Sequence, residues 1–136
     1  LQAVLAHHRA GTLPGNALVK LYFSGGMTGR GGYTFGLPAT RRALDAYLEM
    51  LDGTSFAWAV AVLGGDCVRS GMAEMALRAG GHLRVGHEDW AGDGETPSNA
   101  QLVREAVELC ARVGRPVASP DEAAAMLGMA PRASLT

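Results

Sequence analysis

Residues Phe56–Leu63 read FAWAVAVL, an almost unbroken apolar run that ends at Gly64 and Gly65. Continuous hydrophobicity, without alternation of apolar and polar residues, is typical of a strand covered on both faces, as in a parallel sheet. A second run of strand formers, Ala17–Phe23 (ALVKLYF), ends at a Ser-Gly-Gly turn. A shorter strand is predicted over His82–Gly86, so the sequence indicates three strands of one parallel sheet.

Amphipathic segments lie between and after these runs. Thr40 is expected to cap a helix that ends at Gly53, and a further helix is predicted over Val68–Ala79. Two later helices begin with capping boxes, in which a serine is followed three positions later by Gln or Glu: Ser98–Gln101 and Ser119–Glu122. Strict alternation of strand and helix with short glycine-rich joints predicts a parallel α/β fold.

Three strands cannot close a barrel, so they form either a small open α/β layer or the last part of a closed barrel. The chain has 136 residues, no linker and no internal repeat, and residues 1–136 are therefore interpreted as a single unit. It begins without Met inside a predicted helix, which suggests a piece of a longer protein.

The composition argues against several classes of protein. Apolar residues make up 48% and charged residues 18%, which suffices for a packed core and is unlike a disordered chain. The net charge of −1 argues against general binding to nucleic acid or to a membrane surface. No apolar run has transmembrane length, the N-terminus has no signal-peptide layout, and Cys67 and Cys110 lie far apart. We therefore expect a cytoplasmic protein with reduced thiols.

In parallel α/β folds the functional side chains lie just past the carboxyl ends of strands. The Ser-Gly-Gly turn at residues 24–26 and the Gly-Gly turn at 64–65 either let the backbone approach an anionic ligand or simply need glycine as turns. The glycines within residues 29–32 do not open a helix directly after a strand, so they form no dinucleotide-binding fingerprint. Asp66 is interpreted as a helix N-cap in preference to a substrate contact.

The third strand end is the richest in charged side chains. By the two-residue period of a strand, Arg84, Gly86 and Glu88 share one side, and Gly86 leaves room for a ligand between the guanidinium and the carboxylate. Asp89 follows where the strand becomes a loop. One cation and two carboxylates at a strand end fit a metal ion with a base beside it, and a solvent-exposed Arg–Glu pair fits the same pattern.

Residues 80–89 read GGHLRVGHED, and after a short loop residues 98–103 read SNAQLV. These stretches resemble the signature of the β-keto acid cleavage enzyme family (the 3-keto-5-aminohexanoate cleavage enzymes), which reads GGHxRxGxE followed by Asp or Asn, and then a helix that opens with NAxLV. The GRPVA of residues 114–118 and the WAVA of residues 58–61 are also similar to the family. The resemblance runs from about Ala10 to Met129.

The resemblance implies a zinc-dependent (β/α)8 TIM barrel, of which this chain is the C-terminal half with about three strands. It implies that Glu88 is a carboxylate ligand of the catalytic zinc, that Asp89 is the acid–base group, and that Arg84 orients Asp89 and favours its ionised form. The implied reaction is attack of a deprotonated β-keto acid on acetyl-CoA, transfer of CoA, and retro-Claisen cleavage. The products are acetoacetate and a new CoA thioester.

Two features depart from the family's pattern. The family also holds its zinc with a His-x-His pair, whereas His7 and His8 are adjacent on a predicted helix and are interpreted as a solvated helix end. The other zinc ligands are therefore expected in the N-terminal half that this chain lacks. His87 stands where the family has an apolar residue and is expected to pack or to support the site. Trp90 is expected to narrow the pocket or to pack in the loop, and His82 at the strand start to be structural.

Three functions stay open at this point. The first is a β-keto acid cleavage enzyme that is a homo-oligomer when intact and inactive as this chain alone. The second is a half-barrel without catalysis that has a structural role. The third is another zinc- or magnesium-dependent barrel aldolase, which has no need of acetyl-CoA. The sequence does not identify which β-keto acid is used.

Overall fold

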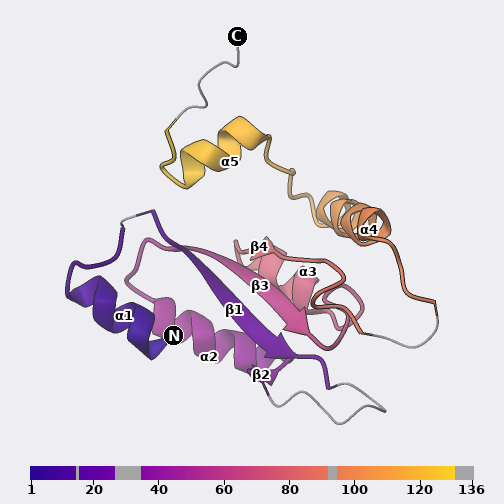
Figure 1. The fold of residues 1–136 in the computed structure, drawn as a ribbon, viewed down its shortest axis with the longest axis horizontal. Helices are drawn as coiled ribbons and strands as arrows, with labels where there is room; N and C mark the ends of the chain where they lie inside the picture. The colour runs from indigo at the N-terminus through magenta and orange to yellow at the C-terminus, as the bar shows by residue number, and fades with distance from the viewer. Residues whose placement is uncertain (15, 27–34, 92–94, 131–136) are drawn as a thin grey trace.

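The computed structural model describes residues 1–14, 16–26, 35–91 and 95–130. Its centre is a parallel sheet with the strand order β2-β1-β3-β4 (Figure 1). The strands are β1 (Leu18–Ser24), β2 (Leu37–Pro38), β3 (Ala57–Leu63) and β4 (His82–Leu83). The helices in these described ranges are α1 (Gln2–Arg9), α2 (Arg41–Leu51), α3 (Met72–Arg78), α4 (Asn99–Arg112) and α5 (Pro120–Met126). The predicted α/β fold with a parallel sheet is therefore confirmed.

The three predicted strands are present, and β1 pairs with β3 along its full length. β4 is shorter than predicted, because the chain leaves the sheet after Leu83 instead of continuing to Gly86. β2 begins at Leu37, the last residue of the segment Met27–Leu37, whose glycine content predicts a loop. It pairs with the last two residues of β1. Residues 27–34 of that segment, including the glycines within 29–32, lie outside the described residues.

The hydrophobic core lies between the sheet and the helices on one of its faces. The largest fully buried side chains come from both layers: Phe23, Val60 and Val62 from the sheet, Leu44 from α2 and Met72 from α3. Burial of each such side chain contributes roughly 1.5–3 kcal/mol of favourable transfer free energy. Along β1 every second residue is buried, and the residues between them are exposed or half-buried. β1 therefore has one covered face and one open face.

Local capping signals set the starts of three helices as predicted. Thr40 Oγ1 accepts a hydrogen bond from Ala43 N (3.3 Å) at the start of α2. Both capping boxes are present, Ser98–Gln101 at α4 and Ser119–Glu122 at α5. In each box the serine hydroxyl and the Gln or Glu side chain accept hydrogen bonds from each other's backbone N–H, so two otherwise unpaired donors are satisfied.

α3 begins later than predicted, at Met72 and not near Val68. Asp66 Oδ1 accepts hydrogen bonds from the N–H groups of Val68 and Arg69, both at 2.9 Å. These bonds stabilise a turn that precedes the helix, and the residue directly before α3 is Gly71, with a φ of 78°. Asp66 thus makes the kind of contact that the sequence predicts, but it caps this turn and not α3.

The carboxyl ends of β1 and β3 meet through glycines. Gly25 N donates a hydrogen bond to Leu63 O (2.9 Å). A Cβ built on Gly25 would overlap the main chain of Gly64 and Gly65, and a Cβ on Gly65 would lie 2.6 Å from the Cα of Gly25. Gly26 and Gly64 have positive φ values of 65° and 70°, as the turn interpretation requires. Gly25 and Gly65 are explained by a third cause, close packing of main chain on main chain.

The two cysteines are free thiols, as predicted. Cys67 is buried, and burial raises the pKa of its thiol to about 12, with the nearby Asp66 and Asp89 carboxylates acting in the same direction. The Cys67 side chain is therefore a neutral part of the core. Within the described ranges, no helix has the length and apolar character needed to cross a membrane.

Candidate active site

The chain turns back on itself directly after β4. Arg84 still donates its backbone N–H to a carbonyl of β3 (2.9 Å), but the N–H groups of Asp89 and of the next residue both donate to Gly86 O, at 3.1 and 3.0 Å. The prediction of an extended strand with Arg84, Gly86 and Glu88 on one side is therefore wrong, because residues 87–89 form a turn. The turn brings both carboxylates back to the guanidinium.

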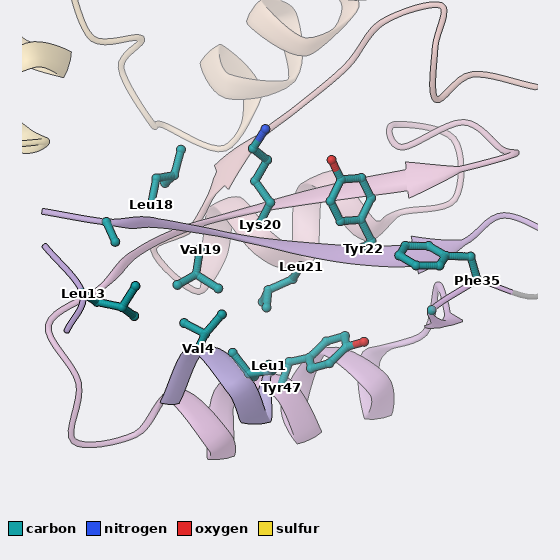
Figure 2. A pocket seen from close by; sticks show the side chains of 12 residues that line it. Leu1, Val4, Leu13, Leu18, Val19, Lys20, Leu21, Tyr22, Phe35 and Tyr47 are labelled. Carbon is teal, nitrogen blue, oxygen red and sulfur yellow. The ribbon is translucent and has the colours of Figure 1, made fainter. Parts of the chain in front are cut away.

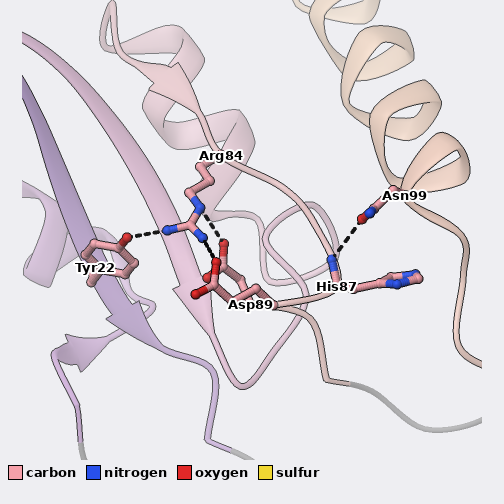
Figure 3. A network of polar contacts seen from close by, with 6 residues as sticks. Tyr22, Arg84, His87, Asp89 and Asn99 are labelled. Carbon is pink, nitrogen blue, oxygen red and sulfur yellow. Dashed lines mark hydrogen bonds and ion pairs between the residues drawn. The ribbon is translucent and has the colours of Figure 1, made fainter.

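The guanidinium of Arg84 has a different partner at each of its three nitrogens (Figure 3). Nη1 donates to the hydroxyl of Tyr22 on β1, and Nη2 donates to Oε2 of Glu88. Nε lies 3.1 Å from Oδ2 of Asp89. Arg84 Cζ also lies 5.7 Å from the centroid of the Tyr22 ring, a cation–π distance. These contacts fix the guanidinium between β1 and the turn.

Asp89 is the buried member of the cluster, with 4% of its surface exposed. Its backbone carbonyl accepts hydrogen bonds from Gly64 N (2.8 Å) and Gly65 N (3.4 Å), which tie the turn to the end of β3. Neither carboxylate oxygen has a hydrogen-bond partner among the described residues, so the approach of Arg84 Nε is an ion pair without hydrogen-bond alignment. A buried carboxylate in this state is costly, and a bound proton or ligand lowers the cost.

The surroundings of Asp89 raise its pKa above the ordinary value. Burial is the largest cause; the positive charge of Arg84 lowers the pKa, the negative charge of Glu88 raises it, and Lys20 lowers it. Arg84 therefore favours the ionised form, as predicted, but burial outweighs that effect. A carboxyl group with a raised pKa is suited to carry a proton in a reaction near neutral pH.

Glu88 lies at the rim of the cluster, with 77% of its side chain exposed. Its ion-pair partner is Arg84, so the structure contains the exposed Arg–Glu pair that the sequence left open, together with a buried aspartate that this alternative did not include. Among the described residues, no group of three or more His, Cys, Asp and Glu side chains is placed to hold a metal ion. Glu88 and Asp89 are the two carboxylates here that can contribute to such a site.

His87 faces away from the cluster, toward the start of α4 (Figure 3). Its backbone N–H donates to Asn99 Oδ1 (3.0 Å), and its ring Nε2 contacts the carbonyl of Pro97. Trp90 forms an isolated parallel β-bridge with Gly65 and lines the small cavity beside Asp89. His87 is thus an exposed residue whose contacts tie the turn to the start of α4, and Trp90 narrows the space next to the carboxylate.

The other histidines lie away from the cluster. His82 starts β4 and is half-buried; burial lowers its pKa, and the positive charge of Arg115 acts in the same direction. His7 and His8 are exposed in the last turn of α1, where His8 packs on Phe56 with ring centroids 4.6 Å apart. Phe56 precedes the amino end of β3, opposite the end that carries the cluster.

Tyr22 and Asn99 are contact residues that the sequence analysis did not single out. Tyr22 is 62 residues away from Arg84 in the sequence, and the parallel pairing of β1, β3 and β4 brings the two together. The available signal was the polar alternation of Lys20, Tyr22 and Ser24 along the first strand, with strand ends that meet at one edge. For Asn99 the signal was its position at the start of the capped helix.

Comparison with known proteins gives consistent matches along most of the chain. The model of the beta-keto acid cleavage enzyme family matches residues 1–129. The chain is similar to the 3-oxoadipate:acetyl-CoA acetyltransferase of Cupriavidus necator, with 40% identity over 101 residues that cover 68% of this chain and 34% of the relative. It is also similar to the 3-keto-5-aminohexanoate cleavage enzyme of Acetoanaerobium sticklandii, with 38% identity over 101 residues that cover 72% of this chain and 36% of the relative.

A more distant relative is named for a different substrate. The 3-dehydrocarnitine:acetyl-CoA trimethylamine transferase of Rhizobium meliloti is 32% identical over 83 residues, which cover 58% of this chain and 27% of that protein. The matched region therefore spans about a third of the length of these curated relatives.

Proposed function

The chain belongs to the β-keto acid cleavage enzyme family, and we propose on that basis that the full-length protein cleaves a β-keto acid with acetyl-CoA. In this reaction the deprotonated β-keto acid attacks acetyl-CoA, CoA is transferred, and retro-Claisen cleavage yields acetoacetate and a new CoA thioester. Two of the relatives are named for acetyl-CoA, which supports this co-substrate over an aldolase reaction. All of the relatives described above are named as enzymes, which disfavours a purely structural role.

We further propose that the described sheet is the last part of a (β/α)8 barrel. The strands are parallel, strand and helix alternate, and the candidate site lies at the carboxyl ends of the strands, where barrel enzymes carry their catalytic groups. The relatives are about three times as long as the matched region, which leaves enough chain for the other strands.

The observation that carries the proposal is the buried Asp89 carboxylate held beside Arg84. In the proposed mechanism Asp89 takes a proton from the carbon between the keto and carboxylate groups of the substrate. Its raised pKa makes the protonated form accessible, and neither of its oxygens has a hydrogen-bond partner among the described residues. Arg84 holds the carboxylate in place, and Tyr22 holds Arg84.

The described residues do not by themselves fit a catalytic zinc ion, which normally has three protein ligands. Glu88 is exposed at the rim and offers one carboxylate, and the side chain of the adjacent His87 faces away toward the start of α4. We therefore propose that Glu88 is the ligand that this chain contributes and that the other ligands come from elsewhere in the full-length protein.

The test is an assay of acetoacetate formation by the full-length protein from acetyl-CoA and a panel of β-keto acids. Asp89→Asn should lower turnover by about 100- to 10,000-fold, the usual cost of removing a general base. Asp45→Asn is the matched control, because Asp45 is an exposed partner of Arg41 on α2. If Asp89→Asn turns over at the rate of the control, or if the unaltered protein consumes no acetyl-CoA with any β-keto acid, the proposal fails.

A further inference from the structure

The open face of β1 carries Lys20 and Tyr22. Figure 2 shows both side chains on one side of the strand and Val19 and Leu21 on the other. Lys20 is exposed and Tyr22 is half-buried, whereas Val19 and Leu21 are part of the core. Lys20 and Tyr22 therefore project from the same face, and the hydroxyl of Tyr22 contacts the candidate catalytic cluster through Arg84.

The neighbouring strand leaves free space beside these two side chains. Lys20 pairs with Ala59 of β3, and Tyr22 pairs with Ala61. Because the alanine side chain ends at Cβ, these two residues leave space above the sheet between Lys20 and Arg84. Lys20 and Arg84 both line one groove that runs between the sheet and the helices α4 and α5. Its walls are formed by residues such as Ala59, Leu83, Val85 and Val107.

The ammonium group of Lys20 has no hydrogen-bond or ion-pair partner within the described part of the chain. It is the single lysine among the twelve Lys and Arg residues. The guanidinium of Arg84, by contrast, has a protein partner at each nitrogen. Because Lys20 is exposed and lines the groove, an anion that enters the groove can accept a charge-assisted hydrogen bond from its ammonium group.

Lys20 lies on the same face of β1 as Tyr22, and the Tyr22 hydroxyl contacts Arg84 of the candidate site. Two residues along a strand span about 7 Å, so the Cα of Lys20 lies about that far from the Cα of Tyr22 along β1. A substrate that keeps its reacting carbon beside Asp89 can therefore place its far end, several bonds away, beside the Lys20 ammonium.

We infer that Lys20 binds an anionic group at the far end of the substrate, so that the enzyme prefers β-keto acids that carry a second carboxylate. The inference rests on the proposed function and adds the substrate class to it. A methyl group at the far end would leave the ammonium unpaired, and an ammonium group there would be repelled by it.

The experiment uses the full-length protein and three β-keto acids of matched length whose far ends are a carboxylate, a methyl group and an ammonium group. The kcat/KM of the unaltered protein should be highest for the dicarboxylate. Lys20→Gln should lower the preference for carboxylate over methyl by roughly 10- to 100-fold, the usual effect of one hydrogen bond to a charged group. Lys20→Arg should keep the preference, and Lys20→Glu should reverse the order in favour of the ammonium substrate.

Arg104→Gln is the matched control, because Arg104 is an exposed cation of α4 and does not line the groove. Calorimetric binding of a dicarboxylate that lacks the keto group provides a second measurement, independent of turnover.

If Lys20→Gln weakens this binding but no β-keto acid is turned over, the Lys20 site stands and the proposed function fails. If turnover is normal and Lys20→Gln keeps the substrate preference of the control, Lys20 is not the selective residue. An equal loss with all three substrates, together with a lower Tm, would show that a carboxylate of the protein pairs with Lys20, and would overturn the inference.

Discussion

Glu88 and Asp89 are adjacent in the sequence and contact the same guanidinium, yet 77% of the Glu88 side chain is exposed and 6% of the Asp89 side chain is exposed. Because only Asp89 is removed from water, burial raises the pKa of Asp89 and makes it the acid–base candidate. Glu88 remains free to accept a further partner from outside the described residues. The turn after β4 thus assigns the two carboxylates to different tasks.

The three contacts of Arg84 predict that Arg84→Lys impairs turnover of the full-length protein. A lysine ammonium cannot contact Tyr22, Glu88 and Asp89 in the fork geometry of a guanidinium. Loss of one hydrogen bond to a charged group corresponds to a decrease in kcat/KM of roughly 10- to 100-fold. The assay is acetoacetate formation, and Arg41→Lys on the exposed face of α2 is the control. Equal rates for the two variants would mean that Arg84 does not position Asp89.

The exposed position of Glu88 predicts that zinc binding by the full-length protein depends on this side chain. In the full-length protein, Glu88→Gln should lose both zinc and activity, whereas Asp89→Asn should lose activity and keep zinc. Elemental analysis of the purified variants provides the measurement. The isolated chain should bind zinc only weakly, because the described residues contain no three-ligand group. Tight stoichiometric zinc binding by the isolated chain would show that His87 or the His7–His8 pair is a ligand.

The buried thiol of Cys67 predicts a loss of stability at alkaline pH. Its pKa is raised from the ordinary value of 9.0 to about 12 in the folded protein. Above pH 9 the unfolded chain releases the thiol proton while the folded chain keeps it, so this contribution to stability is complete below pH 9 and is lost as the pH rises toward 12. Urea unfolding of the full-length protein at pH 8 and pH 10.5 measures the change. Cys67→Ala should show a smaller decrease between the two pH values, and an equal decrease would contradict the assignment.

The open edge of β1 predicts that this chain self-associates when it is produced alone. Of the residues of β1, only Phe23 and Ser24 pair with β2, and a groove lined by apolar side chains such as Leu1, Val4 and Leu13 follows that edge (Figure 2). Unpaired strand edges and exposed apolar side chains favour intermolecular pairing. Light scattering should give a mass above 14.1 kDa. A monodisperse species of that mass with a cooperative thermal transition would contradict this prediction. We also expect the full-length protein to be an oligomer.

Much of the fold could be predicted because its signals are local. The unbroken apolar run of β3 and the capping boxes at Ser98 and Ser119 each act within a few residues, and each produced the expected element. β4 was overestimated because the pattern of Arg84, Gly86 and Glu88 suits a strand as well as a turn. The hydrogen bonds that the N–H groups of the turn donate to Gly86 O decide between the two, and they leave no periodic signal in the sequence.

The candidate site could be located from the sequence, but the burial of Asp89 and the contact of Arg84 with Tyr22 could not be predicted. Arg84, Glu88 and Asp89 are brought together as expected. The burial of Asp89 depends on the bonds from Gly64 N and Gly65 N to its carbonyl, which join segments far apart in the sequence. The contact between Tyr22 and Arg84 likewise depends on the order of the strands. Such features follow from tertiary packing, which periodicity in one segment does not report.

The contact between Gly25 and Gly65 limits how this part of the protein can evolve. When two side chains touch, a larger residue on one side can be accommodated by a smaller one on the other. Here each glycine faces main chain, which no substitution can make smaller. A library that randomises both positions should therefore return glycine at each of them, without covariation between the two. Sequence change near the carboxyl ends of β1 and β3 is expected only at the residues around these glycines.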